Sequence, residues 1–127
     1  MAIISVSLSP RMLEELDRIR AEMGFSGRSE AIRAALRMLI GDAKEKGAIR
    51  GRVKGILLLI HEHEAEGFVC DVKHSFLDII HTQLHNRFEE GKCLELFVLD
   101  GEADRVRDFA GIFQRNEGID HMKLIII

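Results

Sequence analysis

Residues 85–93 read His-Asn-Arg-Phe-Glu-Glu-Gly-Lys-Cys, and this segment decides how the second half of the chain is interpreted. Strand-forming residues stand on both sides of the Glu-Glu-Gly, which is typical of two strands joined by a tight turn. A hairpin of this length pairs Arg87 with Cys93 and His85 with Glu95, so that His85 and Cys93 lie on a diagonal. An imidazole and a thiol within reach of one ion indicate a metal site.

The segments around this hairpin alternate between strand and helix patterns. The expected elements are a strand at 53–60, a helix at 62–74, hairpin strands at 78–88 and 92–99, a helix marked by Val106, Phe109, Ala110 and Phe113, and a strand at 123–127. This βαββαβ order predicts a ferredoxin-like domain, with the helices on one face of an antiparallel sheet. The other face would stay open for a partner.

The alternation of side chains along each strand assigns the hairpin residues to two faces. We expect the apolar residues to point to the helices, namely Ile80, Leu84, Phe88, Leu94, Leu96 and Val98. The polar residues are then expected on the open face, namely His81, Gln83, His85, Arg87, Cys93 and Glu95. His74 lies about 140° around its helix from Val69, so it also faces away from its own core. It could meet the hairpin of a neighbouring subunit.

The first half of the chain has a different pattern, a strand followed by two helices. Residues 2–8 alternate as a half-buried strand, and Ser9-Pro10 then caps a helix that Gly24 ends. A second helix is expected from near Gly27, with Glu30 reaching back as in a capping box, before residues 41–51 become a charged linker. So few residues cannot bury a core alone, and we expect the unit to dimerise.

Pairing the strand with its twin would make a two-stranded ribbon that fits the major groove of DNA. This layout, with the run Arg28-Ser29-Glu30-Ala31-Ile32-Arg33, resembles the ribbon-helix-helix repressors. The resemblance implies that the outward strand residues Ile3, Ser5 and Ser7 face the bases. It also implies that Arg28 and Ser29 lie near the DNA backbone, as suits helix-end amides and an arginine. Ile3 departs from the family, in which a basic or long polar residue is usual, and this weakens base readout.

The composition agrees with a soluble regulator. The 127 residues are 46% hydrophobic and 31% charged, and no apolar run has the length of a membrane span, so a cytoplasmic protein is expected. Residues 1–52 hold ten Lys and Arg against seven Asp and Glu, whereas residues 53–127 hold eight against fourteen. A basic half joined to an acidic half favours an anion-binding module and a regulatory module. We find no nucleophile–base pair, phosphate loop or acid–base carboxylate pair, and therefore expect no enzyme.

Over essentially its whole length the chain resembles the nickel-responsive (NikR-type) transcriptional regulators. The match includes Leu84-His85, Cys93-Leu94-Glu95 and the spacing to His74. The resemblance implies a ribbon-helix-helix DNA-binding domain at 1–48 and a ferredoxin-like, ACT-type sensing and tetramerisation domain at 52–127. It also implies a homotetramer, a dimer of dimers, that binds a double-stranded operator. Nickel would be held by His85 and Cys93 of one subunit and His74 of another.

Arg87 stands where this family has its fourth ligand, a histidine. A guanidinium has no lone pair to donate, so the inherited metal site is one ligand short. Three outcomes stay open: water or a small ligand completes the site; Cys70 completes a set with His74, His85 and Cys93 that favours zinc or cobalt; or the metal is lost and Arg87 forms an ion pair. A different reading is a small-molecule sensor in which Arg87 anchors a carboxylate. Ala34 is a second departure, at a position where relatives often carry an acidic residue.

Overall fold

The computed structural model describes residues 2–127, which form two compact units, one ending at Gly47 and one spanning Ala48–Ile127. The chain is of the α+β class, as expected, with helices α1 to α4 and strands β1 to β4. Within the described residues, no helix combines the length and the apolar character that crossing a bilayer requires.

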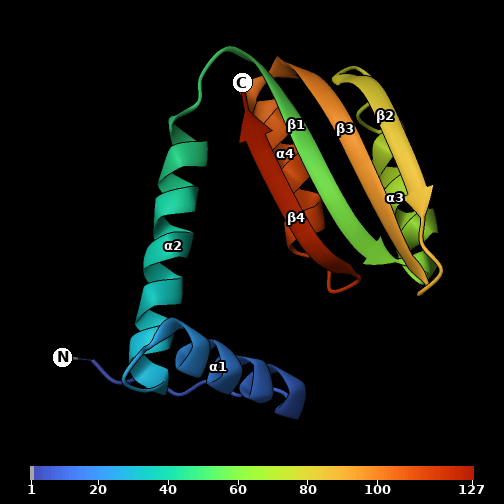
Figure 1. Cartoon of the computed structure of the whole chain (residues 1–127). Helices are drawn as coiled ribbons and strands as arrows, with labels where there is room; N and C mark the ends of the chain where they lie inside the picture. Colours follow the sequence, from blue (N-terminus) through green and yellow to red (C-terminus); the bar gives the residue numbers. More distant parts are fainter. Residues whose placement is uncertain (1) are drawn as a thin grey trace. The chain divides into compact units, whose positions relative to one another are not determined.

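The N-terminal unit contains helices α1 (Pro10–Met23) and α2 (Arg28–Ala48) (Figure 1). The expected caps are confirmed. The Met12 amide donates to Ser9 Oγ at 3.2 Å, and Gly24 ends α1 with a φ of 76°, a left-handed conformation that glycine adopts without strain. At the start of α2 the Glu30 carboxylate accepts from the Ser26 amide at 2.8 Å.

Two expectations for this unit are wrong for the single chain. Residues 2–8 form no strand, because the described residues offer them no strand to pair with. The expected linker at 41–51 is helical as far as Ala48, where residues with favourable helix propensity and an ion pair between Lys46 and Asp42, 2.9 Å apart, extend α2. Among residues 2–47 only Ala31 is buried, so the unit has almost no core of its own.

The C-terminal unit has the expected βαββαβ order. It consists of β1 (Arg52–Glu62), a short 3₁₀ turn η1 (His63–Ala65), α3 (Glu66–His74), β2 (Ile80–Arg87), β3 (Lys92–Glu102), α4 (Ala103–Gln114) and β4 (Ile119–Ile126). The sheet order is β2-β3-β1-β4, with every neighbouring pair antiparallel. Helices α3 and α4 cover one face of this sheet (Figure 1).

Aromatic side chains fill the space between the sheet and the helices. Phe97 of β3 packs edge-on against Phe109 of α4 with ring centroids 5.2 Å apart, and Phe109 contacts Phe113 and Phe76, each at 5.0 Å. All four rings are buried. The apolar stripe expected on the second helix of this domain is therefore confirmed as the centre of its core.

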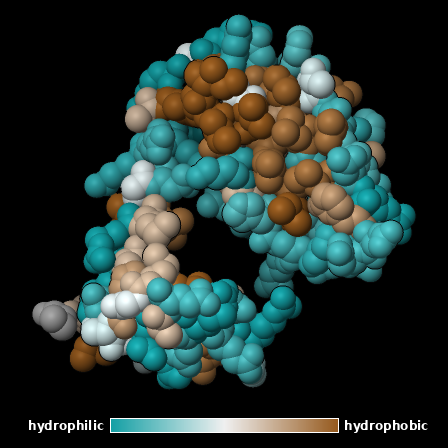
Figure 2. Space-filling model, viewed as in Figure 1, coloured by the Kyte–Doolittle hydropathy of each residue, from teal (hydrophilic) through white to brown (hydrophobic). Residues whose placement is uncertain are grey.

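The opposite face of the sheet carries a second apolar layer that the chain does not cover. We call it the open face and define it by the half-buried Ile56, Leu58, Ile60, Leu94, Leu96 and Val98 together with the exposed Leu84 and Ile125. Figure 2 shows this surface as a broad hydrophobic area over the strands. An apolar area of this kind is typical of a protein interface.

Candidate metal centre

The register of the hairpin is the one expected from the sequence. Arg87 pairs with Cys93 and His85 pairs with Glu95 across β2 and β3, so His85 and Cys93 do lie on one diagonal. Gly91 makes the turn with a φ of 78°, and the Phe88 amide donates to the Lys92 carbonyl at 2.8 Å to close it. The hairpin thus brings the imidazole and the thiol to neighbouring positions.

The faces of the hairpin are the reverse of those expected. Cys93 and Glu95 are buried on the helix-covered side, together with Phe97 and Leu99, whereas Leu94, Leu96 and Val98 belong to the open face. Both faces of β3 carry apolar residues. The sequence favours the aliphatic face, with Leu94, Leu96 and Val98, as the side that packs against the helices. The helices instead select the face with Phe97, because its ring fits the aromatic side chains of α4.

The side chains of β2 follow the same reversal. Gln83 and His85 lie on the helix-covered side, where Gln83 Nε2 donates to Glu95 Oε1 at 2.8 Å, while Leu84 and Phe88 are exposed. A register shift between Ile80 and Thr82 separates His81 from this set. His81 lines a different pocket with Lys54 and Val98.

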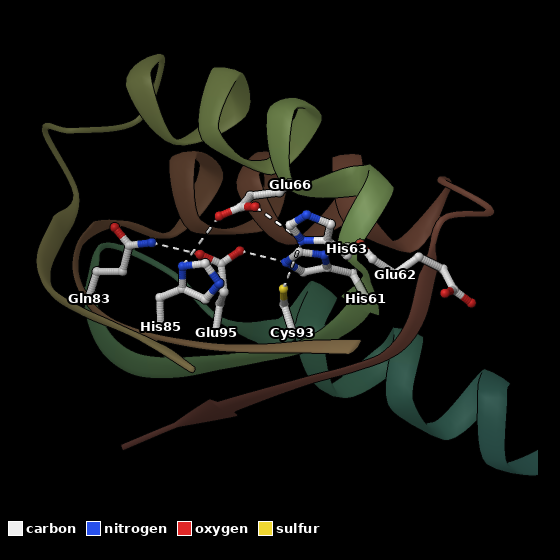
Figure 3. A network of polar contacts seen from close by, with 8 residues as sticks. All are labelled: His61, Glu62, His63, Glu66, Gln83, His85, Cys93 and Glu95. Carbon is white, nitrogen blue, oxygen red and sulfur yellow. Dashed lines mark hydrogen bonds and ion pairs between the residues drawn. The ribbon is translucent and has the colours of Figure 1, made fainter. Parts of the chain in front are cut away.

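A buried polar network lies beside the hairpin ligands and was not anticipated. His61 and Glu95 are 0% and 3% exposed, and His61 Nε2 is 2.8 Å from Glu95 Oε2 (Figure 3). His61 Nδ1 faces the Glu62 carbonyl at 2.7 Å, so both ring nitrogens point at oxygen acceptors. His61 is not among the ligand candidates expected from the sequence. The alternation with Leu57 and Leu59 along β1 was the signal that could have placed it inside.

His63, at the start of η1, lies against Cys93. Its Nδ1 is 4.0 Å from Cys93 Sγ and 3.3 Å from Glu66 Oε2, while Glu66 Oε1 is 3.7 Å from His85 Nδ1 (Figure 3). The His63 amide donates to the Gly91 carbonyl at 2.8 Å, which ties this residue to the hairpin turn. Neither His63 nor Glu66 is among the ligands that the family resemblance implies.

A pocket of about 530 Å³ lies between α3 and the sheet. Its lining includes His63, Glu66, Cys70, Gln83, His85 and Glu95. Burial, together with the charge of Glu66, raises the pKa of the Cys93 thiol, and the nearby charge of Arg87 acts in the opposite direction. A raised thiol pKa opposes metal binding, because the ion must displace the thiol proton to bind the thiolate.

His74, the third candidate ligand, lies at the exposed end of α3. Its Nδ1 is 2.8 Å from the Cys70 carbonyl and 3.8 Å from Cys70 Sγ. A ring that donates from Nδ1 to a carbonyl keeps the lone pair of Nε2, which is the tautomer that a metal ligand needs. Within residues 2–127 of this single chain, no three His, Cys, Asp or Glu side chains are arranged around one point that could hold an ion.

The DNA-contact candidates belong to the N-terminal unit. Ile3, Ser5 and Ser7 are exposed, with Ile3 at 92%. Arg28 makes a two-pronged ion pair with Asp17, with its Nε and Nη2 at 2.9 and 3.0 Å from the carboxylate oxygens. This exposed pair occupies the guanidinium that is expected near the DNA backbone.

Comparisons with known proteins cover both units. Residues 54–127 match the family model of the NikR C-terminal nickel-binding domain, and residues 2–43 match that of the ribbon-helix-helix proteins of the copG family. The solved structure of an uncharacterised protein, TM1266 from Thermotoga maritima, aligns with 60% of this chain and 98% of its own at a TM-score of 0.55 and 18% identity. That likeness supports the fold alone.

Curated relatives extend over both domains. Proteins from Methanocella arvoryzae and Pyrococcus abyssi, each named "Putative nickel-responsive regulator", are 32% and 35% identical to this chain. The first alignment covers 98% of this chain and 91% of the relative, and the second covers 96% and 90%. The chain therefore belongs to the family of nickel-responsive transcriptional regulators that join a ribbon-helix-helix domain to a NikR C-terminal domain, and it is a regulator and not an enzyme.

Proposed function

We propose that this chain is a cytoplasmic, nickel-responsive regulator that binds a specific DNA operator as a homotetramer. The observation that carries the proposal is the placement of His85 and Cys93 on neighbouring positions of one sheet face, beside a pocket that opens under α3. Residues 1–48 would form the DNA-binding domain, and residues 52–127 the metal-sensing and tetramerisation domain.

The donors present fit nickel at three of the four positions that the family uses. His85 and Cys93 would bind from one subunit, and the exposed Nε2 of His74 from another. Imidazole and thiolate suit a borderline ion such as nickel, with zinc and cobalt as competitors. Arg87 does not fit, because its guanidinium carries a charge and no lone pair.

Two uncovered apolar surfaces support assembly. The N-terminal unit exposes the side chains Met12, Met23 and Leu36 along its helices, as expected if a second copy completes its core. The open face of the C-terminal unit offers a second surface for pairing. Tetramer formation would also bring His74 of one subunit to the hairpin of another.

DNA contact is proposed for Ile3, Ser5 and Ser7 on a ribbon formed by two chains, with Arg28 and Ser29 on the phosphates. A metal ion shared between subunits would favour one arrangement of the two ribbons, and this differential stability is what couples metal to operator affinity.

The test has two arms on the full-length protein without a His-tag. Selection from a random duplex library, with nickel and with a chelator, identifies the operator, and fluorescence anisotropy then measures its affinity in both conditions. Tight binding that requires nickel supports the proposal. Equal affinity after chelation would remove the metal from the mechanism, and zinc or cobalt acting at lower concentration than nickel would change the assigned ion.

A further inference from the structure

We propose that His63 supplies the metal ligand that Arg87 cannot, so that His63, His85 and Cys93 of one subunit and His74 of another form the site. This inference rests on the proposed function and names the fourth ligand within it. It keeps a set of three nitrogens and one sulfur, but moves one imidazole from β2 to the start of η1.

The distances around Cys93 favour His63. Two nitrogen or sulfur ligands of one ion, with bonds of about 2.0–2.3 Å, lie about 3–4 Å apart. His63 Nδ1 is 4.0 Å from Cys93 Sγ, at the upper end of this range, before any ion draws the two together.

The backbone fixes His63 in this position. Its amide donates to Gly91 at 2.8 Å, and the preceding Glu62 is tied to Lys92 by an ion pair of 2.5 Å. The end of β1 is thereby joined to the two residues that precede Cys93. A ligand on a rigid backbone loses little entropy when it binds.

Glu66 lies between the two histidines of the subunit. Its carboxylate oxygens are 3.3 Å from His63 Nδ1 and 3.7 Å from His85 Nδ1. The same two nitrogens that approach Glu66 would have to turn toward the ion. The proposal requires the two rings to rotate toward the ion, with Glu66 beside them to offset the positive charge of the ion and of Arg87.

Cys70 is the rival donor, since it lines the same pocket. Its sulfur is 3.8 Å from His74 Nδ1, the nitrogen that already faces a backbone carbonyl. Binding through Cys70 would make a site with two sulfurs, whereas His63 makes one with a single sulfur. The two ligand sets therefore differ in the number of sulfur donors, which can be measured.

The experiment titrates full-length protein with Ni²⁺ and with Co²⁺, following thiolate charge-transfer and d–d absorption. It compares the wild type with His63→Gln, Cys70→Ser, the histidine control His121→Gln on β4 and the double variant His63→Gln/Arg87→His. We expect His63→Gln to weaken Ni²⁺ binding at least tenfold, roughly the minimum for a lost ligand, and to shift the Co²⁺ bands. Cys70→Ser and His121→Gln should match the wild type. The double variant should regain affinity, because a histidine at 87 returns the fourth nitrogen.

The outcomes separate this inference from the proposed function. No binding of either ion by the wild type contradicts the proposed function itself. Normal binding and spectra in His63→Gln, or a loss in Cys70→Ser, overturn the His63 assignment alone. X-ray absorption of the nickel-loaded wild type does not depend on how a variant folds: one sulfur donor supports His63, and two sulfurs overturn it.

Discussion

Arg87 lies directly opposite Cys93 in the pairing of β2 with β3. The chain thus places a permanent cation beside the only buried thiol of its described residues. That cation favours the Cys93 thiolate but repels a divalent ion.

The first prediction separates the charge of Arg87 from its missing lone pair. Arg87→Met removes the cation and should strengthen Ni²⁺ binding severalfold, and Arg87→His should strengthen it by a similar factor, because His63 already supplies the fourth ligand. Competition with a chromophoric chelator measures both affinities. Arg11→His, in the other unit, is the control. A much larger gain in the His variant would show that the wild-type site lacks a fourth ligand.

The buried pair of His61 and Glu95 gives a second prediction, on stability. His61→Leu leaves the Glu95 carboxylate buried with Gln83 as its remaining side-chain partner, and should cost about 3–5 kcal/mol of unfolding free energy. The double variant His61→Leu/Glu95→Leu should be much more stable than this single variant, because no charge is then left unpaired inside.

Urea unfolding at one protein concentration measures this cycle. Lys92→Ala breaks ion pairs to Glu62 and Asp120 that are largely exposed, so it is the control and should cost much less. If the loss of unfolding free energy in the double variant equals the sum of the losses in His61→Leu and Glu95→Leu alone, His61 and Glu95 act independently.

The ion pair of Asp17 with Arg28 predicts a variant that binds DNA more tightly. Asp17→Asn releases the guanidinium of Arg28 for a DNA phosphate and should raise operator affinity by roughly threefold. The slope of log affinity against log salt concentration should steepen by about one unit at most. Anisotropy titrations at several salt concentrations measure both. Glu22→Gln removes the same charge from the same helix but is paired with Arg18, so it controls for net charge. If both variants gain equally, Arg28 has no particular role.

The open face predicts how the assembly can be broken. Leu96→Lys places a charge in the middle of this apolar layer and should reduce the mass in solution, since burying an unpaired charge costs several kcal/mol. Light scattering after size exclusion gives the mass. Asp108→Lys, on the exposed side of α4, should leave it unchanged. An unchanged mass in Leu96→Lys would place the interface elsewhere.

The sequence by itself determined the local features of this protein. The caps at Ser9 and Gly24, the hairpin turn at Gly91 and the pairing of His85 with Glu95 are all confirmed, because each depends on residues close together in the chain. The order of strands and helices and the family motif follow from the same short-range patterns. His74 was also expected to face away from its own core, and it is exposed.

Only the tertiary structure decided which face of the hairpin is covered. Phe97 and Leu96 are neighbours in the chain and both apolar, so alternation alone could not choose between their faces. Phe97 packs against the aromatic rings of α4, and Cys93 and Glu95, on the same face of β3, are therefore buried with it. The placement of His63 beside Cys93 is likewise a contact between segments thirty residues apart, made by the pairing of β1 with β3. The missing metal ligand at Arg87 was therefore evident from the sequence alone. The position of His63, the histidine proposed to replace it, depends on the assembled sheet.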